Sequence, residues 1–426
     1  MEIITKLLWV IATIMIVGVG LYLTFSLKFV QFNFKQMFKS IFKKEKNTIS
    51  PISTLMLTLG GRIGVGSVAG VALALYLGGP GTIFWIWITA FIAATNTFGE
   101  TILGMKYHEK DNELYRGGAP YYIKKGLKNS RLGIIYAILI IISYVGGFIG
   151  IQANTITKSL NEITTINPII VGLIISVIAF LIIIGGITKI SKATNKIVPF
   201  MLIVYLSCGL YVFITQIDQM PYILKTIVTS AFNFESFTLG FLPVFIIGIQ
   251  RGIFSNEAGI GTGSIASSTS NIKQPVVNGY VQMLGIYITT LLVCSATAIM
   301  IMSFDYQSIL TNDMNGIELT LQAFHHHFNN LGNVIIMTCI ILFAFSTVLT
   351  GYYYGESCLK FLFKNPSKKT ILILKIATVL VLFLGSIVSS TKLWNMIDIL
   401  VALLAIINVY TIYKLKDEIK EQLNKS

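Results

Sequence analysis

The sequence predicts an all-α polytopic membrane protein with about eleven transmembrane helices, because it is hydrophobic, poor in charge and built from long apolar runs. Of its 426 residues, 54% are hydrophobic and 12% are charged, and the mean hydropathy is +0.76. Soluble domains carry about 25% charged residues. So little charge cannot cover a soluble surface, which excludes a soluble enzyme or a disordered chain. The four cysteines lie far apart without metal-site spacing, and we interpret them as packing residues.

Apolar runs long enough to cross a bilayer fill the chain almost from end to end. A spanning helix needs about 20 such residues. The expected spans are 7–28, 53–77, 81–104, 132–157, 168–187, 197–215, 237–266, 277–303, 333–359, 370–390 and 392–413. The first run lacks a small-residue cleavage site and is expected to be a retained helix. The chain therefore divides into an N-terminal helix with a basic connector (1–50), a core (51–413) and a cytoplasmic tail (414–426).

Most of the 32 Lys and Arg residues lie in connections that share one side of the membrane in an eleven-span topology. These connections are 28–50, 105–131, 189–196, 251–275, 360–375 and 414–425. Basic residues in short connections mark the cytoplasmic side. We therefore expect the N-terminus outside and the C-terminus inside. Because topology accounts for the net charge of +14, no nucleic-acid partner is expected.

Two glycine-rich stretches predict helices that are broken inside the membrane. The first runs from Gly60 to Ser67 (GGRIGVGS), and glycine costs about 1 kcal/mol per residue within a helix. Broken backbone at bilayer depth persists only when it is buried or lines a cavity. The alternative is close helix packing through small residues. The second stretch spans Gly248–Gly252 and continues through Asn256 to Gly263, five spans later.

Two breaks at matching places predict a 5+5 inverted repeat, which is typical of secondary transporters. The repeats would be 51–216 and 235–413, behind one additional helix. The end of a broken helix offers free N–H groups, which suit a carboxylate. Its free carbonyls suit an ammonium group or Na⁺. One unwound segment can therefore bind a zwitterionic amino acid.

Four motifs give the chain a resemblance to a known family: GRIGVGSVAGVALALYLGGPGTIFWIW, GGAPYYIKKGL, RGIFSNEAGIGTGSIASS and FAFSTVLTGYYYGES. They resemble the alanine/glycine:cation symporters (sodium:alanine symporter family) from about residue 30 to 413. The resemblance implies the leucine-transporter-like fold of the amino acid–polyamine–organocation superfamily. It also implies Na⁺- or H⁺-coupled uptake of a small neutral amino acid, alanine or glycine, by alternating access. The expected location is a bacterial or archaeal plasma membrane.

Carrying the fold over residue by residue implies a sodium site at the first break. The carbonyls of Gly60 and Ile63 would face the hydroxyls of Ser346 and Thr347. Such oxygen atoms suit a small hard cation. The alternative for adjacent Ser and Thr in a membrane helix is hydrogen bonding to the preceding turn of the same helix.

The resemblance also implies a substrate site. The N–H groups of Val65 and Gly66 would bind the carboxylate, and the Arg62 carbonyl would bind the ammonium group. Gln152 and Asn154 match the QAN motif of the family and are candidate polar contacts. Packing or interhelical hydrogen bonding is the alternative for both. The stretch that contains Gly248 and Gly252 would close the pocket.

This chain departs from the family pattern at two places. Many members read GTGN where this chain has GVGS, so Val65 and Ser67 lack the threonine hydroxyl and the asparagine amide. Many members also place tryptophan where Thr350 and Gly351 stand here. Loss of an indole would enlarge the pocket and favour a longer substrate such as glutamine.

Charged residues within the spans are costly and are functional candidates by default. We expect Arg62 to pair with Glu100 or Glu257 as a lock or gate, or to supply a fixed charge that replaces a cation. Glu257 could carry a proton, but a capping or gate role is favoured. Glu356 and Arg251 are expected near the cytoplasmic helix ends, where such side chains snorkel to the membrane surface.

The histidines do not favour catalysis or metal binding. His325, His326 and His327 are expected in an external loop, where adjacent side chains point in different directions. A membrane-embedded enzyme would need paired carboxylates, a Ser/His pair or a metal cluster within the spans. A proton-coupled transporter and a transporter-derived sensor remain open alternatives. The predicted partners are a small neutral amino acid and the lipid bilayer, with Na⁺ as coupling ion and no obligatory protein partner.

Overall fold

The computed structural model describes residues 2–43, 49–111, 114–232, 240–270, 272–305, 307, 316–388 and 390–425. The first half contains α1 (Glu2–Ser26), η1 (Val30–Phe32), α2 (Phe34–Ile41), α3 (Pro51–Arg62), η2 (Val65–Ser67), α4 (Ala69–Gly78), α5 (Gly81–Lys106), β1 (Glu109–Asp111), β2 (Leu114–Arg116), α6 (Ala119–Lys125), α7 (Ser130–Ile140), η3 (Ile141–Phe148), α8 (Ile149–Ile163), α9 (Pro168–Ile183) and α10 (Gly186–Thr215).

The second half begins after η4 (Ile217–Gln219), at the amphipathic helix α11 (Met220–Ala231). It continues with α12 (Phe241–Asn256), α13 (Thr262–Ser267), α14 (Pro275–Tyr287), η5 (Ile288–Cys294), α15 (Ser295–Met302), α16 (Ile317–Leu362), α17 (Lys368–Gly385), α18 (Ser390–Lys414) and α19 (Lys416–Asn424). Non-helical backbone at Asn329 divides α16 into two helices. The expected start of the second repeat, at residue 235, lies outside the described residues.

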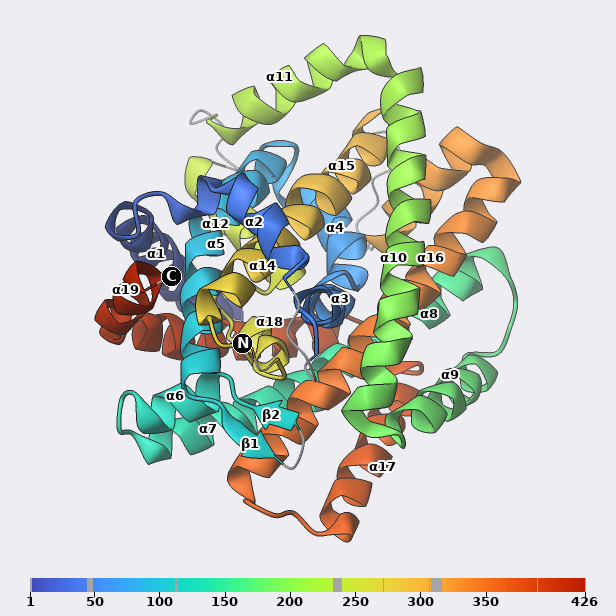
Figure 1. The fold of residues 1–426 in the computed structure, drawn as a ribbon. Coiled ribbons are helices and arrows are strands. Elements are labelled where there is room, and N and C mark those ends of the chain that lie inside the picture. The colour runs from blue at the N-terminus through green and yellow to red at the C-terminus, as the bar shows by residue number, and fades with distance from the viewer. Residues whose placement is uncertain are drawn as a thin grey trace.

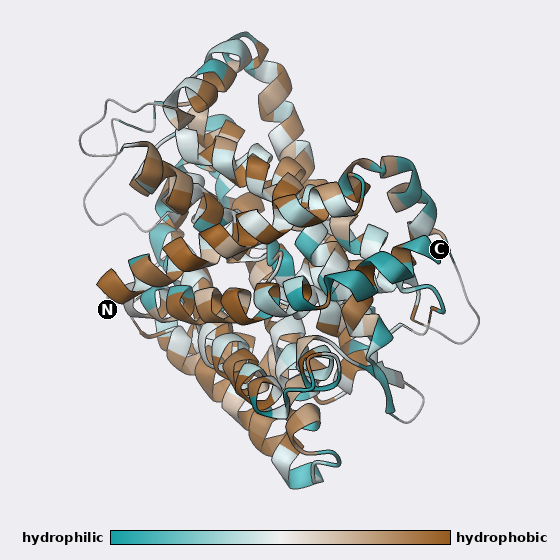
Figure 2. Ribbon diagram, turned by 90° about the vertical axis from the view of Figure 1, so that its left-hand side faces the viewer, coloured by the Kyte–Doolittle hydropathy of each residue, from teal (hydrophilic) through white to brown (hydrophobic). Residues whose placement is uncertain are grey.

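The predicted spans are confirmed as helices. Seven described helices are long and apolar enough to cross a membrane, and the bent pair of Pro51–Arg62 and Val65–Gly78 adds an eighth. The other three predicted spans coincide with the shorter helices α9, α12 with α13, and α17. Apolar residues cover most of the long helices, whereas hydrophilic residues gather at the C-terminal helix and in connections (Figure 2).

Local sequence signals fix where several spans begin. The side chain of Ser50 accepts a hydrogen bond from the Ser53 N–H, and Pro51 occupies the first turn of α3. Asn129 and Asn167 cap α7 and α9 in the same way. Ser or Asn at this position satisfies one of the N–H groups that lack a partner within the helix. Proline is favoured in the first turn because its missing N–H is not needed there.

The two broken helices lie inside the bundle. Residues of α3 and α4 are buried almost throughout, as are those of α12 and α13 near their break. Helices α10, α14 and α16 pack around α3, and α5 packs against α12 and α14. Figure 1 shows α11 across one end of the molecule, with α6 and the antiparallel β1–β2 hairpin toward the opposite end. The unwound backbone is thus enclosed by protein, as its free polar groups require.

Candidate functional site

The first predicted break is present. Helix α3 ends at Arg62, α4 starts at Ala69, and the chain bends by 67° between them. Ile63 donates its N–H to the Leu59 carbonyl over 2.7 Å, and its φ and ψ of −84° and 75° then leave the helical region. Gly64 is extended. The backbone N–H and carbonyl groups that follow are therefore released from the helix.

Two side chains from other helices reach this segment. The Gln152 Oε1 atom of α8 accepts the Val65 N–H over 3.2 Å. The Thr347 hydroxyl of α16 lies 3.1 Å from the Gly60 carbonyl and 3.3 Å from that of Gly61. A Cβ added to Gly64 would contact Thr347 Oγ1 and would lie 3.2 Å from Gln152 Oε1. Glycine at this position therefore allows both polar side chains to approach the break.

The hydroxyls of Ser346 and Thr347 bond within their own helix, which was the alternative interpretation, and Thr347 also faces α3, as the sodium site requires. Ser346 and Thr347 both bond to the Phe343 carbonyl, at 2.9 and 3.0 Å, as hydroxyls in membrane helices often do. Only Thr347 also reaches the end of α3. The Ser346 hydroxyl faces the sulfur of Met201 at 3.8 Å. Gly60 and Thr347 thus provide adjacent oxygen atoms from two helices, and this donor set fits Na⁺.

An aromatic column that the sequence analysis did not predict covers the break. A Cβ added to Gly66 would lie 2.9 Å from the Phe254 ring of α12. Phe254 stacks on Phe148 with a centroid distance of 5.0 Å, and Phe148 stacks on Tyr144 at 4.6 Å. Tyr144 and Phe148 belong to a π-helical segment, a distortion that is frequent at functional sites. The adjacent Gly146 and Gly147 weaken a regular helix in this run, but glycine alone does not specify a π-helix.

Ser67 connects the two broken helices. Its hydroxyl lies 2.8 Å from that of Ser255, and its carbonyl accepts the Thr297 hydroxyl over 2.9 Å. At this position, where the resemblance implies asparagine, the serine therefore faces a polar group of α12.

The second break lies in the later part of the predicted stretch, and its earlier part is helical. Helix α12 continues through 248–252, and the interruption comes at Glu257, Gly259 and Gly261, which all have positive φ. Gly248 and Gly252 instead lie where α12 packs on α5: an added Cβ would contact Trp85 or lie 3.2 Å from Thr89. These two glycines allow close helix packing, and the structure does not bring them to the first break.

Asn154 also lies apart from the first break. Its amide donates to the carbonyls of Gly385, the last residue of α17, and of Val388, which follows that helix, at 3.3 and 2.6 Å. Gln152, two residues earlier, points to α3 instead, so only one of the two polar residues in the motif reaches the site. Gly351, in the region where the family has tryptophan, faces Tyr144, with 3.6 Å between an added Cβ and that ring.

Arg62 is buried without the predicted ion pair. Its guanidinium donates to the Gln282 carbonyl over 3.1 Å, and within the described residues it forms no salt bridge. Glu257 accepts hydroxyl hydrogen bonds from Tyr144 and Thr262, at 2.8 and 2.7 Å. The glutamate at the second break is therefore satisfied without Arg62.

Arg251 was expected near a cytoplasmic helix end, and that expectation is wrong. It lies within α12 and pairs with Asp398 of α18 over 2.7 Å, and both side chains are buried. Its guanidinium also lies over Trp394, 5.3 Å from the ring centroid. Glu356 does lie near the end of α16, where it faces Arg116 at 3.5 Å.

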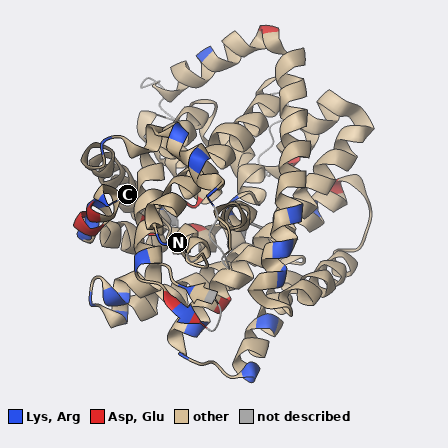
Figure 3. Ribbon diagram, viewed as in Figure 1, with Lys and Arg blue, Asp and Glu red and all other residues tan. Residues whose placement is uncertain are grey.

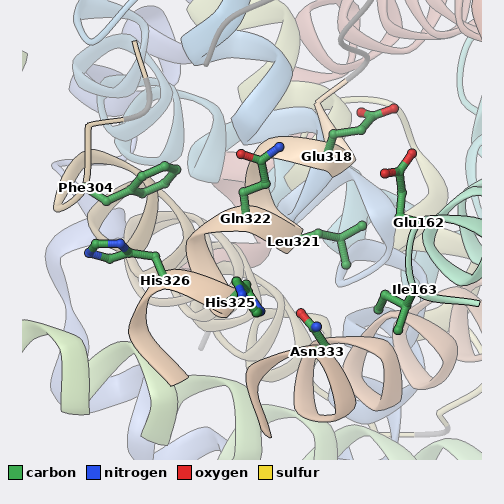
Figure 4. Close-up of a pocket in the computed structure, with 9 residues that line it drawn as sticks. All are labelled: Glu162, Ile163, Phe304, Glu318, Leu321, Gln322, His325, His326 and Asn333. Atoms are coloured by element: carbon green, nitrogen blue, oxygen red, sulfur yellow. The ribbon is translucent and has the colours of Figure 1, made fainter. Parts of the chain in front are cut away.

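The three histidines lie in a helix, not in the predicted loop. Residues 317–328 form the first part of α16, and the His327 ring bonds to Ser303 and to the Met300 carbonyl, at 2.9 and 3.0 Å. Burial lowers the pKa of His327. A cavity of about 400 Å³ lies beside this helix, and Figure 4 shows Glu162 and Glu318 near each other at its edge. Within the described residues, no group of three or more His, Cys, Asp or Glu could hold a metal.

Comparison with known proteins gives a consistent family assignment. The sequence model of the sodium:alanine symporter family matches residues 1–425. The chain is 35% identical to the amino-acid carrier protein AlsT of Bacillus subtilis, over 95% of this chain and 87% of that protein. It is 34% identical to the probable sodium/glutamine symporter GlnT of the same species (96% and 86% covered). Identity to the sodium/alanine symporter AgcS of Methanococcus maripaludis is also 34% (93% and 89% covered).

Solved structures share the fold at low sequence identity. MhsT in complex with L-phenylalanine superposes with a TM-score of 0.65 at 12% identity, over 86% of this chain and 88% of that one. A Na⁺-coupled sialic acid symporter in a substrate-bound outward-open state superposes with a TM-score of 0.56 at 11% identity, over 96% and 85%. The predicted leucine-transporter-like architecture is confirmed by these matches.

Proposed function

The chain belongs to the sodium:alanine symporter family, and from this premise we propose that it binds substrate and coupling ion together at the break between α3 and α4. As a member, it is a symporter that couples amino acid transport to Na⁺. One observation supports this location above the others. At this break the Val65 N–H faces Gln152 of α8, and the Gly60 carbonyl faces Thr347 of α16.

The substrate carboxylate binds the N–H groups of Val65 and Gly66. In this structure Gln152 accepts the Val65 N–H, so a bound carboxylate would replace an amide oxygen that is already held there. A carboxylate forms the stronger hydrogen bond because it is charged. The Arg62 carbonyl takes the ammonium group, and Phe254 covers the bound molecule from α12.

Sodium is held by the carbonyls of Gly60 and Ile63 with the Thr347 hydroxyl. The Ser346 hydroxyl, which faces Met201 in this structure, would join them after rotation of its side chain. The ion supplies a positive charge that stabilises the unwound end of α3 and the nearby carboxylate. Gly64 couples the two sites because it lies against both Thr347 and Gln152. A shift of the break that changes one contact therefore changes the other, which links ion binding to substrate binding.

The substrate is alanine, glycine or glutamine. Relatives named for alanine and for glutamine are about equally similar to this chain, so identity alone does not separate them. Gly351 carries no side chain beside Tyr144, which lies 3.6 Å from an added Cβ, in the region where the resemblance implies an indole. This favours a pocket that also accepts glutamine.

The cytoplasmic face is the one that carries most of the basic residues. Lys and Arg gather on α2, α6, α17, α19 and the hairpin, whereas the top of the view around α11 carries few (Figure 3). Basic connections remain on the cytoplasmic side. We therefore place the N-terminus outside, the C-terminus inside, and the protein in a bacterial or archaeal plasma membrane.

Uptake by proteoliposomes tests the proposal. Labelled alanine, glycine and glutamine are offered under an inward Na⁺ gradient, then under an equal K⁺ gradient, and finally under a proton gradient alone. Accumulation that needs Na⁺ supports the proposal and identifies the substrate. Accumulation driven by protons alone would instead support the proton-coupled alternative, and no accumulation under any gradient would favour a sensor.

A further inference from the structure

A second cavity, of about 640 Å³, lies away from the broken helices, where the β1–β2 hairpin, α6 and the connection from α16 to α17 meet. Figure 3 shows basic residues on all three parts, toward the bottom of the view. The cavity lining is rich in positive charge. Its basic residues are Lys110, Arg116, Lys124, Lys125, Lys360 and Lys364, and its acidic residues are Glu109 and Asp111.

The two acidic residues already have cationic partners. Glu109 pairs with Lys125 over 2.9 Å, and Asp111 pairs with Arg116 and with Lys360. Within the part of the chain that the structure describes, Lys110, Lys124 and Lys364 form no salt bridge. Three lysines that have no acidic partner among the described residues therefore converge on one cavity. Basic residues of a cytoplasmic surface are common, but they normally extend separately into water.

Arg116 forms the buried wall of this cavity. It is 6% exposed, and its Nη1 atom has no hydrogen-bond partner among the described residues. A second nitrogen, Nη2, lies 3.5 Å from Glu356 of α16. Although burial acts in the opposite direction, Arg116 and Lys360 hold the pKa of Asp111 below its usual range. The cavity thus combines the buried guanidinium of Arg116 with the ammonium groups of several lysines.

We propose that this cavity binds a phosphate-bearing anion at the cytoplasmic surface of the protein. A phosphate group carries several acceptor oxygens and more than one negative charge. Arginine binds such a group through its planar fork, and lysine binds it as a point charge. The volume of the cavity accommodates a phosphate with an attached organic group, and its excess of cations favours a dianion.

The ligand would act on the inner end of α16. Lys360 and Glu356 belong to this helix, and the same helix carries Thr347 at the first break. In the observed state Asp111 and Glu356 share Arg116 and Lys360. A phosphate that competes for these two cations would loosen the contact between the hairpin and α16. The site is therefore positioned to modulate transport without belonging to the substrate pathway.

Thermal unfolding in a neutral detergent tests binding. Inorganic phosphate is compared with chloride at matched ionic strength, using the whole protein. We expect phosphate to raise the melting temperature by about 2 °C or more, because a ligand that binds the folded state stabilises it. The double variant Lys124→Gln/Lys364→Gln should lose this shift.

The matched control is Lys192→Gln/Lys196→Gln on α10, which removes the same charge from exposed positions of the same face. This variant should keep the phosphate shift. Equal loss in both variants would mean that phosphate acts on general surface charge, which would overturn the proposal. If inorganic phosphate does not shift the melting temperature of the unmodified protein, a soluble phosphate is excluded and only a lipid headgroup remains as the ligand.

Proteoliposomes distinguish a lipid headgroup from a soluble phosphate. Substrate uptake is measured in phosphatidylcholine vesicles with and without phosphatidylglycerol, and again with inorganic phosphate enclosed. A lipid ligand predicts that phosphatidylglycerol changes the rate for the unmodified protein and for the α10 variant, but not for Lys124→Gln/Lys364→Gln. A soluble ligand predicts the same pattern with enclosed phosphate. If neither compound separates the two variants in either assay, the cavity is not an anion site.

Discussion

The Thr347 hydroxyl lies 3.1 Å from the Gly60 carbonyl, although the two residues are separated by 287 positions in the sequence. This contact joins the ninth predicted span to the end of α3. We predict that Thr347→Val, which removes the hydroxyl at nearly constant volume, raises the Na⁺ concentration for half-maximal uptake about tenfold. Loss of one hydrogen-bonding ligand costs roughly 1–2 kcal/mol.

Thr350→Val is the matched control for this prediction. Thr350 lies one turn further along α16 and donates to the Leu57 carbonyl over 3.2 Å, within the regular part of α3. Its removal should lower thermal stability with little change in Na⁺ dependence. Equal Na⁺ dependence of the Thr347 and Thr350 variants would contradict the sodium assignment.

Gly66 and Gly70 provide a paired test of the substrate site. An added Cβ at Gly66 would lie 2.9 Å from the Phe254 ring, whereas one at Gly70 would lie 4.0 Å from it. Overpacking of this kind costs about 1–3 kcal/mol. We expect Gly66→Ala to reduce initial uptake about tenfold and Gly66→Leu to abolish it, while the protein still purifies as a folded monodisperse species.

Gly70→Ala should keep normal uptake and should stabilise α4, because alanine is favoured over glycine in a helix by about 1 kcal/mol. Both variants place a methyl group on the side that faces Phe254. Normal uptake by Gly66→Leu would disprove the substrate site proposed here.

The buried pair of Arg251 and Asp398 predicts a strong stability effect. Removing one partner of such a pair leaves an unpaired buried charge and costs about 3–5 kcal/mol. Arg251→Met should therefore lower the melting temperature in detergent markedly. The double variant Arg251→Met/Asp398→Asn should recover most of that loss. Additive losses in this double-mutant cycle would show that the two side chains do not interact.

The sequence was sufficient to predict the spans and the first break, because both depend on local composition. Long apolar runs locate helices, and four glycines from Gly60 to Gly66 weaken a helix enough to favour its interruption. The sequence also favours a capping or gate role for the membrane-embedded glutamate Glu257, and this residue ends α12 in the left-handed region.

The features of the site that the sequence did not predict depend on contacts between residues far apart in the chain. Gly248 and Gly252 resemble a break in composition, but they are present because α12 packs closely on Trp85 and Thr89 of α5. The pairing of Arg251 with Asp398 joins residues 147 positions apart. In the π-helical segment that carries Tyr144, the adjacent Gly146 and Gly147 weaken a helix but do not specify its π-helical form. Such features follow from how helices pack, which hydropathy and glycine density do not report.

The last prediction concerns pH and the helix that contains residues 317–328. Burial lowers the pKa of His327, so the folded protein resists protonation that the unfolded chain accepts near pH 6.5. The unfolded state then binds more protons, and stability falls as the pH drops below that value. We expect the melting temperature to be lower at about pH 5.5 than at about pH 7.5. His108, whose pKa burial also lowers, contributes in the same direction.

His327→Gln should reduce this pH dependence, because glutamine can still bond to Ser303 but does not titrate. The remaining dependence should fall further in a double variant with His108→Gln. His325→Gln is the control, since His325 is exposed in the folded protein. If His327→Gln and His325→Gln alter the difference in melting temperature between the two pH values to the same extent, then burial of His327 is not the cause of the pH effect.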